Sequence, residues 1–205
     1  GLPLRIHEVP SGTRALDWEV PQEWNVREAW LKDPAGKTIA DLRWSNLHLV
    51  GHSQPIRARL SLAELRPHLH SLPEHPDWIP YRSSVYRPDW GFCLPHRLLS
   101  ALVPGEYEVV IDSTLSDGSL SYGEVILPGE STDEVLLSSH VCHPSLCNDN
   151  LSGIALLSLL GRYLAGITHR FTYRLLFAPV TIGAICWLAR NESELGRIRH
   201  GLVVT

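Results

Sequence analysis

The chain has 205 residues, long enough to bury a substantial hydrophobic core, and its 44% apolar and 20% charged residues are ordinary for a globular protein. Its formal charge of −4 excludes the basic footprint of a nucleic-acid-binding domain, and no basic run suggests a membrane surface. No apolar stretch reaches the ~18 residues that a membrane-spanning helix needs. The four cysteines are too sparse for the disulfide framework of a secreted protein, so we expect a cytoplasmic protein.

The first half of the chain is rich in tryptophan and proline. Six of the seven tryptophans lie in the first 90 residues, and seven prolines fall between Pro67 and Pro104, a density that breaks helices and central strands alike. Short apolar runs such as 47–50 and 107–111 lie between turn signals. The pattern predicts a β-rich, loop-rich region with one short helix, at 62–68.

The pattern changes after about residue 123. Apolar runs predict strands at 124–127, 134–141, 173–178 and 201–204, and helical spacing predicts helices at 151–164 and 182–191. Alternating strands and helices favour an α/β fold with a parallel sheet covered by helices. Ligands of such sheets bind beyond the carboxyl ends of the strands.

The chain contains no methionine, and its last residues, Gly201-Leu-Val-Val-Thr205, have the composition of a strand that is cut short. We therefore expect a fragment of a longer protein.

Five potential metal ligands lie within ten residues at the end of the strand predicted at 134–141. The ligands are His140, Cys142, His143, Cys147 and Asp149, and imidazole, thiolate and carboxylate are the groups that bind zinc. The same residues are equally compatible with a helix cap, small buried cysteines and hydrogen-bonded loop histidines. No Cys-x-x-Cys pair is present, so a closed structural zinc site is not expected.

Two stretches around these residues carry a family resemblance. Leu136-Leu-Ser-Ser-His-Val-Cys-His-Pro144, followed by Asn148-Asp-Asn-Leu-Ser-Gly153, resembles the zinc aminopeptidase and carboxypeptidase clan. The similarity is greatest to its bacterial aminopeptidase-like branch, which carries an inserted domain of unknown function and often lies in polysaccharide-biosynthesis loci. Three further stretches resemble that branch, namely 8–12, 90–93 and 117–124.

The resemblance implies a domain organisation. A peptidase-like three-layer core with a mostly parallel sheet would be formed by residues 1–20 and 115–205. A β-rich inserted domain, residues 21–114, would interrupt it. The implied activity is zinc-dependent hydrolysis of an N-terminal peptide or other amide bond, with a small peptide or amide as substrate.

The resemblance also assigns roles near the strand end. His140 matches the clan's first ligand histidine, with His143 as an alternative, and Asp149 matches the carboxylate that bridges two metals. Cys142 lies where the clan keeps an aspartate that orients the histidine, and a thiol is a poor substitute for that role.

At the end of the next strand, Pro179-Val-Thr181 lies where the clan places a glutamate pair whose first member is the general base. Val180 occupies the base position and can neither accept a proton nor bind metal. Pro179-Val-Thr181 is also compatible with an ordinary strand-to-helix turn with Thr181 as the N-cap. Val180 favours a non-catalytic chain, unless another carboxylate such as Glu192 or Glu194 substitutes for the base.

The clan's remaining ligands, a carboxylate and a histidine, would lie beyond Thr205. The alternative function is a non-catalytic binding module that kept the fold, and the oligomeric state stays open.

Overall fold

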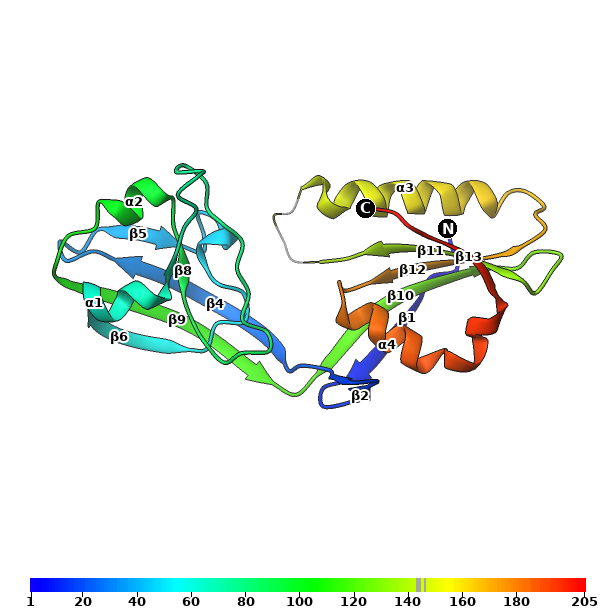
Figure 1. The fold of residues 1–205 in the computed structure, drawn as a ribbon, viewed down its shortest axis with the longest axis horizontal. Coiled ribbons are helices and arrows are strands. Elements are labelled where there is room, and N and C mark those ends of the chain that lie inside the picture. Colours follow the sequence, from blue (N-terminus) through cyan, green and yellow to red (C-terminus); the bar gives the residue numbers. More distant parts are fainter. Residues whose placement is uncertain (143–144, 146) are drawn as a thin grey trace. The chain divides into compact units, whose positions relative to one another are not determined.

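The computed structural model describes residues 1–142, 145 and 147–205, which form two compact units (Figure 1). One unit consists of residues 1–22 and 117–205, and the other of residues 23–116. Within the described residues, no helix is both long and apolar enough to cross a membrane.

A five-stranded sheet forms the centre of the first unit. Its strands, in spatial order, are β1 (Arg5–Pro10), β10 (Ser119–Leu127), β12 (Thr172–Ala178), β11 (Glu134–His140) and β13 (Ile198–Val203). β11 runs parallel to β12 and β13, whereas β10 is antiparallel to β1 and β12.

The sheet is therefore mixed, which corrects the expectation of a mostly parallel one. Residues 128–133 alone connect β10 to β11. That connection is shorter than the dozen or more residues of a parallel crossover, so β11 returns antiparallel to β10.

Two helices cover opposite faces of this sheet (Figure 1). α3 (Asn148–Leu164) places Leu157 and Leu164 against the face that presents Val125, Leu137 and Leu175. α4 (Ile182–Arg190) places Cys186 and Trp187 against the other face, beside Leu176, Ala178 and Tyr122. A 3₁₀ segment, η3 (Glu192–Arg197), leads from α4 to β13, and β2 (Arg14–Ala15) pairs with β3 (Trp18–Glu19).

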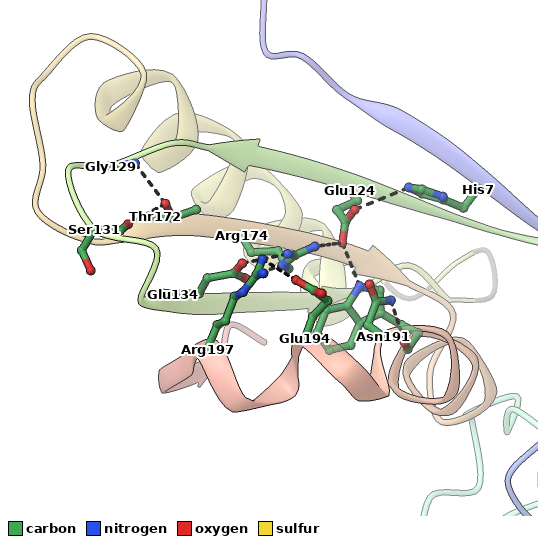
Figure 2. A network of polar contacts seen from close by, with 11 residues as sticks. His7, Glu124, Gly129, Ser131, Glu134, Thr172, Arg174, Asn191, Glu194 and Arg197 are labelled. Carbon is green, nitrogen blue, oxygen red and sulfur yellow. Dashed lines mark hydrogen bonds and ion pairs between the residues drawn. The ribbon is translucent and has the colours of Figure 1, made fainter.

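A row of polar side chains, buried except for the half-buried His7, crosses four strands on the α4 face (Figure 2). Arg174 donates to both oxygens of Glu134 at 2.6 and 2.9 Å and to Glu124 at 2.8 Å. The indole of Trp187 also donates to Glu124, at 2.8 Å, and Nε2 of His7 lies 3.5 Å from the same carboxylate. The hydrogen bonds that Arg174 donates to Glu134 and Glu124 outweigh burial and raise the pKa of Arg174. The row ties β1, β10, β12 and β11 together.

The second unit is built on a four-stranded antiparallel sheet. Its strands, in spatial order, are β5 (Thr38–Asp41), β4 (Glu23–Lys32), β9 (Glu106–Ser116) and β6 (Ile56–Ser61). Ser61 and Glu64 form a reciprocal capping box at the start of α1 (Leu62–Leu65), which continues as η2 (Arg66–His68). This confirms the helical segment predicted at 62–68.

The remaining elements of the second unit are short. They are η1 (Asn46–His48), β7 (Leu69–His70), β8 (Phe92–Cys93) and α2 (His96–Ser100). Its core packs aliphatic side chains of the sheet around Phe92 and Tyr107.

Candidate functional site

His140 and Asp149 meet at the carboxyl edge of the first unit's sheet. His140 is the last residue of β11, and Asp149 lies in the first turn of α3. Nε2 of His140 is 3.0 Å from Oδ1 of Asp149, and the two side chains are 22% and 67% exposed. The pair is thus reachable from solvent at the place where sheets of this kind bind ligands.

The start of α3 is irregular around this pair. Asp149 and Asn150 have non-helical dihedral angles, so regular helix begins at Leu151, as the apolar spacing predicted. The N-cap position, Cys147, makes no side-chain capping bond. The carboxylate of Asp149 faces His140, so capping is not its observed role.

Asn150 is the buried member of the site, with only 4% of its surface exposed. Its side-chain NH₂ lies 2.8 Å from Oγ of Ser139 and 3.1 Å from the carbonyl oxygen of His140. It also lies 3.2 Å from the carbonyl oxygen of Val204 and 3.3 Å from Nδ1 of His140. One amide therefore links the end of β11, the start of α3 and the segment after β13.

Gly153 makes room for that amide. A Cβ at this position would lie 2.2 Å from Oδ1 of Asn150 and 2.5 Å from the carbonyl oxygen of Val204. Any larger residue would push one of them away, so the spacing of Asn150 and Gly153 has a steric cause.

The end of β12 lies beside the end of β11. Ala178 is paired with His140 in the parallel ladder, and the amide of Val141 donates to the carbonyl of Ala178 at 3.0 Å. Val180 follows two residues later with a side chain that is 51% exposed. The position expected for a general base therefore presents an aliphatic group at this edge of the sheet.

Thr181 occupies the N-cap position of α4, but its side chain makes no capping hydrogen bond. Its φ of 62° lies in the left-handed region, which is unfavourable for a β-branched residue. Thr181 therefore lies at the predicted N-cap position, but the expected hydrogen bond from the helix amides to its hydroxyl is not formed. A capping residue needs an extended backbone to direct its hydroxyl toward those amides.

Glu192 and Glu194 lie beyond the other end of α4, in η3. The nine residues of α4 separate them from Val180 by roughly 13 Å along the helix axis. Glu194 forms an ion pair with Arg197. Neither carboxylate takes the place of a base at the strand end.

Comparison with known proteins identifies the family. The model of the family described as "Domain of unknown function (DUF4910)" matches residues 1–205. The chain belongs to this family. A Clostridium acetobutylicum protein, whose name refers to polysaccharide biosynthesis and to an aminopeptidase-like domain, is 48% identical over 204 residues. The DUF4910 chain covers 47% of that relative, so it spans about half of the relative's length.

Solved structures show the same fold. A crystal structure from Clostridium acetobutylicum, provisionally described as a peptidase, has a TM-score of 0.92 at 48% identity over 98% of this chain and 48% of that one. A zinc aminopeptidase from Bacillus subtilis has a TM-score of 0.64 at 13% identity over 98% of this chain and 58% of that one. A peptidase M28 precursor from Shewanella amazonensis has a TM-score of 0.60 at 11% identity, over 99% and 61%. The chain is mixed α/β with several sheets, and its fold is similar to the folds of these peptidases.

The described residues offer a metal two ligands at this site. The 3.0 Å between His140 and Asp149 is close to the ~3.3 Å that separates neighbouring ligands of a tetrahedral zinc ion. His143, the alternative ligand, lies outside the described residues. Among those that are described, no three His, Cys, Asp or Glu side chains gather closely enough to hold a metal ion. The pair fits as part of a ligand shell, not as a complete one.

The involvement of Asn150 was not predicted from the sequence. Asn148-Asp-Asn-Leu-Ser-Gly153 was interpreted as a motif around one ligand, Asp149, but the amide of Asn150 lies 3.3 Å from the imidazole of His140. The sequence shows only an asparagine next to Asp149, and its burial, which makes the amide need several partners, is seen only in the structure.

Proposed function

We propose that this chain is the partial core of a zinc-dependent, aminopeptidase-like hydrolase, which acts on an N-terminal peptide or another amide bond. The observation that carries the proposal is the contact between His140 and Asp149 at the carboxyl edge of the sheet. The M28 fold and the name of the 48% identical relative support the same activity.

In this proposal, His140 and Asp149 hold the metal, with His143 as the alternative to His140. When bound, zinc would supply an activated water and polarise the carbonyl of the substrate. Asp149, with two thirds of its side chain exposed, would anchor the ion on the solvent side, and His140 would fix it to the end of β11. Val180 gives the site no proton acceptor at the position expected for the general base.

The second candidate is a binding module without catalysis. The aliphatic Val180 favours it, and the relative's name suggests a link to polysaccharide biosynthesis. Both candidates place a small molecule at the same edge and involve neither nucleic acid nor a membrane.

Zinc titration followed by metal analysis tests the shared part of the two proposals. We expect weak binding of zinc by the wild type and weaker binding after Asp149→Ala. Comparing His140→Ala with His143→Ala shows which imidazole is the ligand. His200→Ala, which removes an exposed histidine of β13, is the matched control and should bind like the wild type. Equal binding by all five proteins would refute the metal site.

Release of a chromophore from aminoacyl substrates with added zinc measures whether this chain by itself is active. We expect no turnover by the 205-residue chain, because loss of a general base alone costs about 10²–10⁴-fold in rate. Val180→Glu should not restore activity, since two ligands hold a metal loosely. Turnover that is abolished both by a chelator and by Asp149→Ala would show that another residue supplies the base.

A further inference from the structure

The exposed apolar side chains of the two units differ in kind. In the second unit they are mainly aromatic, and the most exposed are Trp44 at 62% and Trp78 at 60%. In the first unit, among the described residues, they are aliphatic apart from Tyr163. Aromatic rings are enriched at binding surfaces, because a flat ring offers a large contact area at little cost in conformational entropy. The second unit therefore has the surface chemistry of a binding site.

Trp78 is held rigidly at the surface. Its indole stacks on the imidazole of His75, with ring centroids 4.0 Å apart and ring planes inclined by 13°. The backbone amide of Trp78 also donates to the carbonyl oxygen of His75 at 3.0 Å, which closes the turn between the two rings. His75 covers one face of the indole, and the 60% exposure of Trp78 leaves the other face open to solvent.

The loop that carries this indole is tied to the short helix α2. The backbone amide of Arg97 donates to the carbonyl oxygen of Pro76 at 3.2 Å, and its Nε lies 2.8 Å from Oδ1 of Asp77. A second guanidinium nitrogen donates to Oδ2 at 3.1 Å, so the ion pair is bidentate. Oγ of Ser71 and Nδ1 of His96 lie 2.9 Å apart and fix the start of the loop. A site that is built in advance in this way loses little freedom when a ligand binds.

These groups favour an uncharged ligand that has a flat apolar face and hydroxyl groups. Asp77 and Arg97 neutralise each other, so a charged ligand would have to break the pair, whereas hydroxyl groups can bridge it. The two bonds of the pair use only part of the acceptor sites of a carboxylate and of the donors of a guanidinium, and both side chains are exposed. A pyranose ring with equatorial hydroxyls meets both requirements, because its axial C–H bonds form an apolar face and its hydroxyls lie at the edge.

We propose that Trp78, with Asp77 and Arg97 beside it, binds an uncharged oligosaccharide of pyranose units with equatorial hydroxyls. One sugar ring stacks on the open face of the indole. Asp77 and Trp78 are consecutive, with Cα atoms about 3.8 Å apart, so hydroxyl groups of the same or the next unit reach the ion pair. The site lies within the second unit and does not depend on the metal site proposed at His140 and Asp149.

A proline-rich peptide is the competing ligand, because proline rings also stack on indoles. Such a peptide offers carbonyl oxygens, which only accept hydrogen bonds, and proline lacks a backbone donor. It would give the carboxylate of Asp77 no new partner. The hydroxyl groups of a sugar both donate and accept, so they match the two members of the pair.

Isothermal titration calorimetry of the 205-residue chain with cellohexaose and with chitohexaose tests the proposal. We expect a dissociation constant of about 1 mM or lower for the wild type. Trp78→Ala should weaken binding by about tenfold or more, as expected for loss of a stacked ring. Trp78→Phe keeps a flat ring and should retain most of the affinity. Tyr163→Ala, which removes an equally exposed ring from the first unit, is the matched control and should bind like the wild type.

Protection of tryptophan fluorescence from iodide gives a second measurement on the wild type alone. Cellohexaose should reduce quenching, because it covers the open face of an indole that is now exposed. Equal affinities of the wild type and Trp78→Ala would overturn the proposal. So would the absence of binding of both oligosaccharides up to about 10 mM, or tighter binding of a proline decapeptide. Variants of His140 and Asp149 should leave these results unchanged, so the two proposals fail separately.

Discussion

Replacing Arg174 by methionine should destabilise the first unit severely. The guanidinium makes three short hydrogen bonds to Glu124 and Glu134, whose side chains are 8% and 5% exposed. Methionine fills similar volume but leaves two buried carboxylates without a cation. Removing one partner from a buried ion pair costs about 3–5 kcal/mol.

The same magnitude follows from protonation. The variant can relieve the repulsion if one glutamate takes up a proton. At pH 7 this protonation costs about 3.4 kcal/mol. The ordinary pKa of a glutamate, 4.5, lies 2.5 units below pH 7, and each unit corresponds to about 1.36 kcal/mol. At pH 5 the same step costs about 0.7 kcal/mol. The destabilisation caused by Arg174→Met should therefore shrink by roughly 2.7 kcal/mol between pH 7 and pH 5.

Urea unfolding followed by circular dichroism measures both values. The matched control is Arg199→Met in the same unit, which breaks the exposed pair with Asp133. Exposed ion pairs contribute about 0–1 kcal/mol, so the control should change little at either pH. If Arg174→Met costs no more than Arg199→Met, or if its cost does not depend on pH, the buried row does not hold the sheet as described.

Three further predictions concern pH, reactivity and organisation. Burial raises the pKa of Glu124, but hydrogen bonds from its two buried donors outweigh it and leave the pKa below 4.5. Its contribution to stability is complete above about pH 4.5 and is lost as pH falls through the lower folded pKa, so Glu124→Gln should flatten the acid side of a stability curve. Burial raises the pKa of the Cys93 thiol to about 12. Iodoacetamide at about pH 8 should therefore alkylate the exposed Cys147 and leave Cys93 unmodified until the protein is denatured, and equal rates of alkylation at the two thiols would contradict this. Limited proteolysis should cut near residues 21 and 114 and release a stable piece between them, whereas cuts spread evenly through 23–116 would count against a separable unit.

The local pattern of the chain was sufficient for several elements. Helical apolar spacing predicted the regular part of α3 from Leu151 and the whole of α4, and the β-branched and leucine-rich runs predicted β11 and β12. These succeed because one buried face imposes a period of 3.6 or 2 on the sequence. The sequence also put His140 and Asp149 close together, since only a short loop separates a strand end from a helix start.

Other features depend on residues that are far apart along the chain. Glu124, Glu134 and Arg174 meet only because β10, β12 and β11 are neighbours in that order, and no local period marks a buried charge that will find a partner. The mixed direction of the sheet likewise depends on which strands pair. Thr181 takes a left-handed backbone that its own preferences oppose, so the packed turn and not local propensity decides it.

The sequence by itself determined the α/β character of the core, the residue types at its carboxyl edge and the absence of a carboxylate at Val180. Only the tertiary structure decided that Asn150 lies against the ring of His140 and that Gly153 makes the space for it. The reason is physical. Which donor faces which ring nitrogen depends on differences of less than 1 Å between segments brought together by packing, and the sequence carries no direct record of those distances.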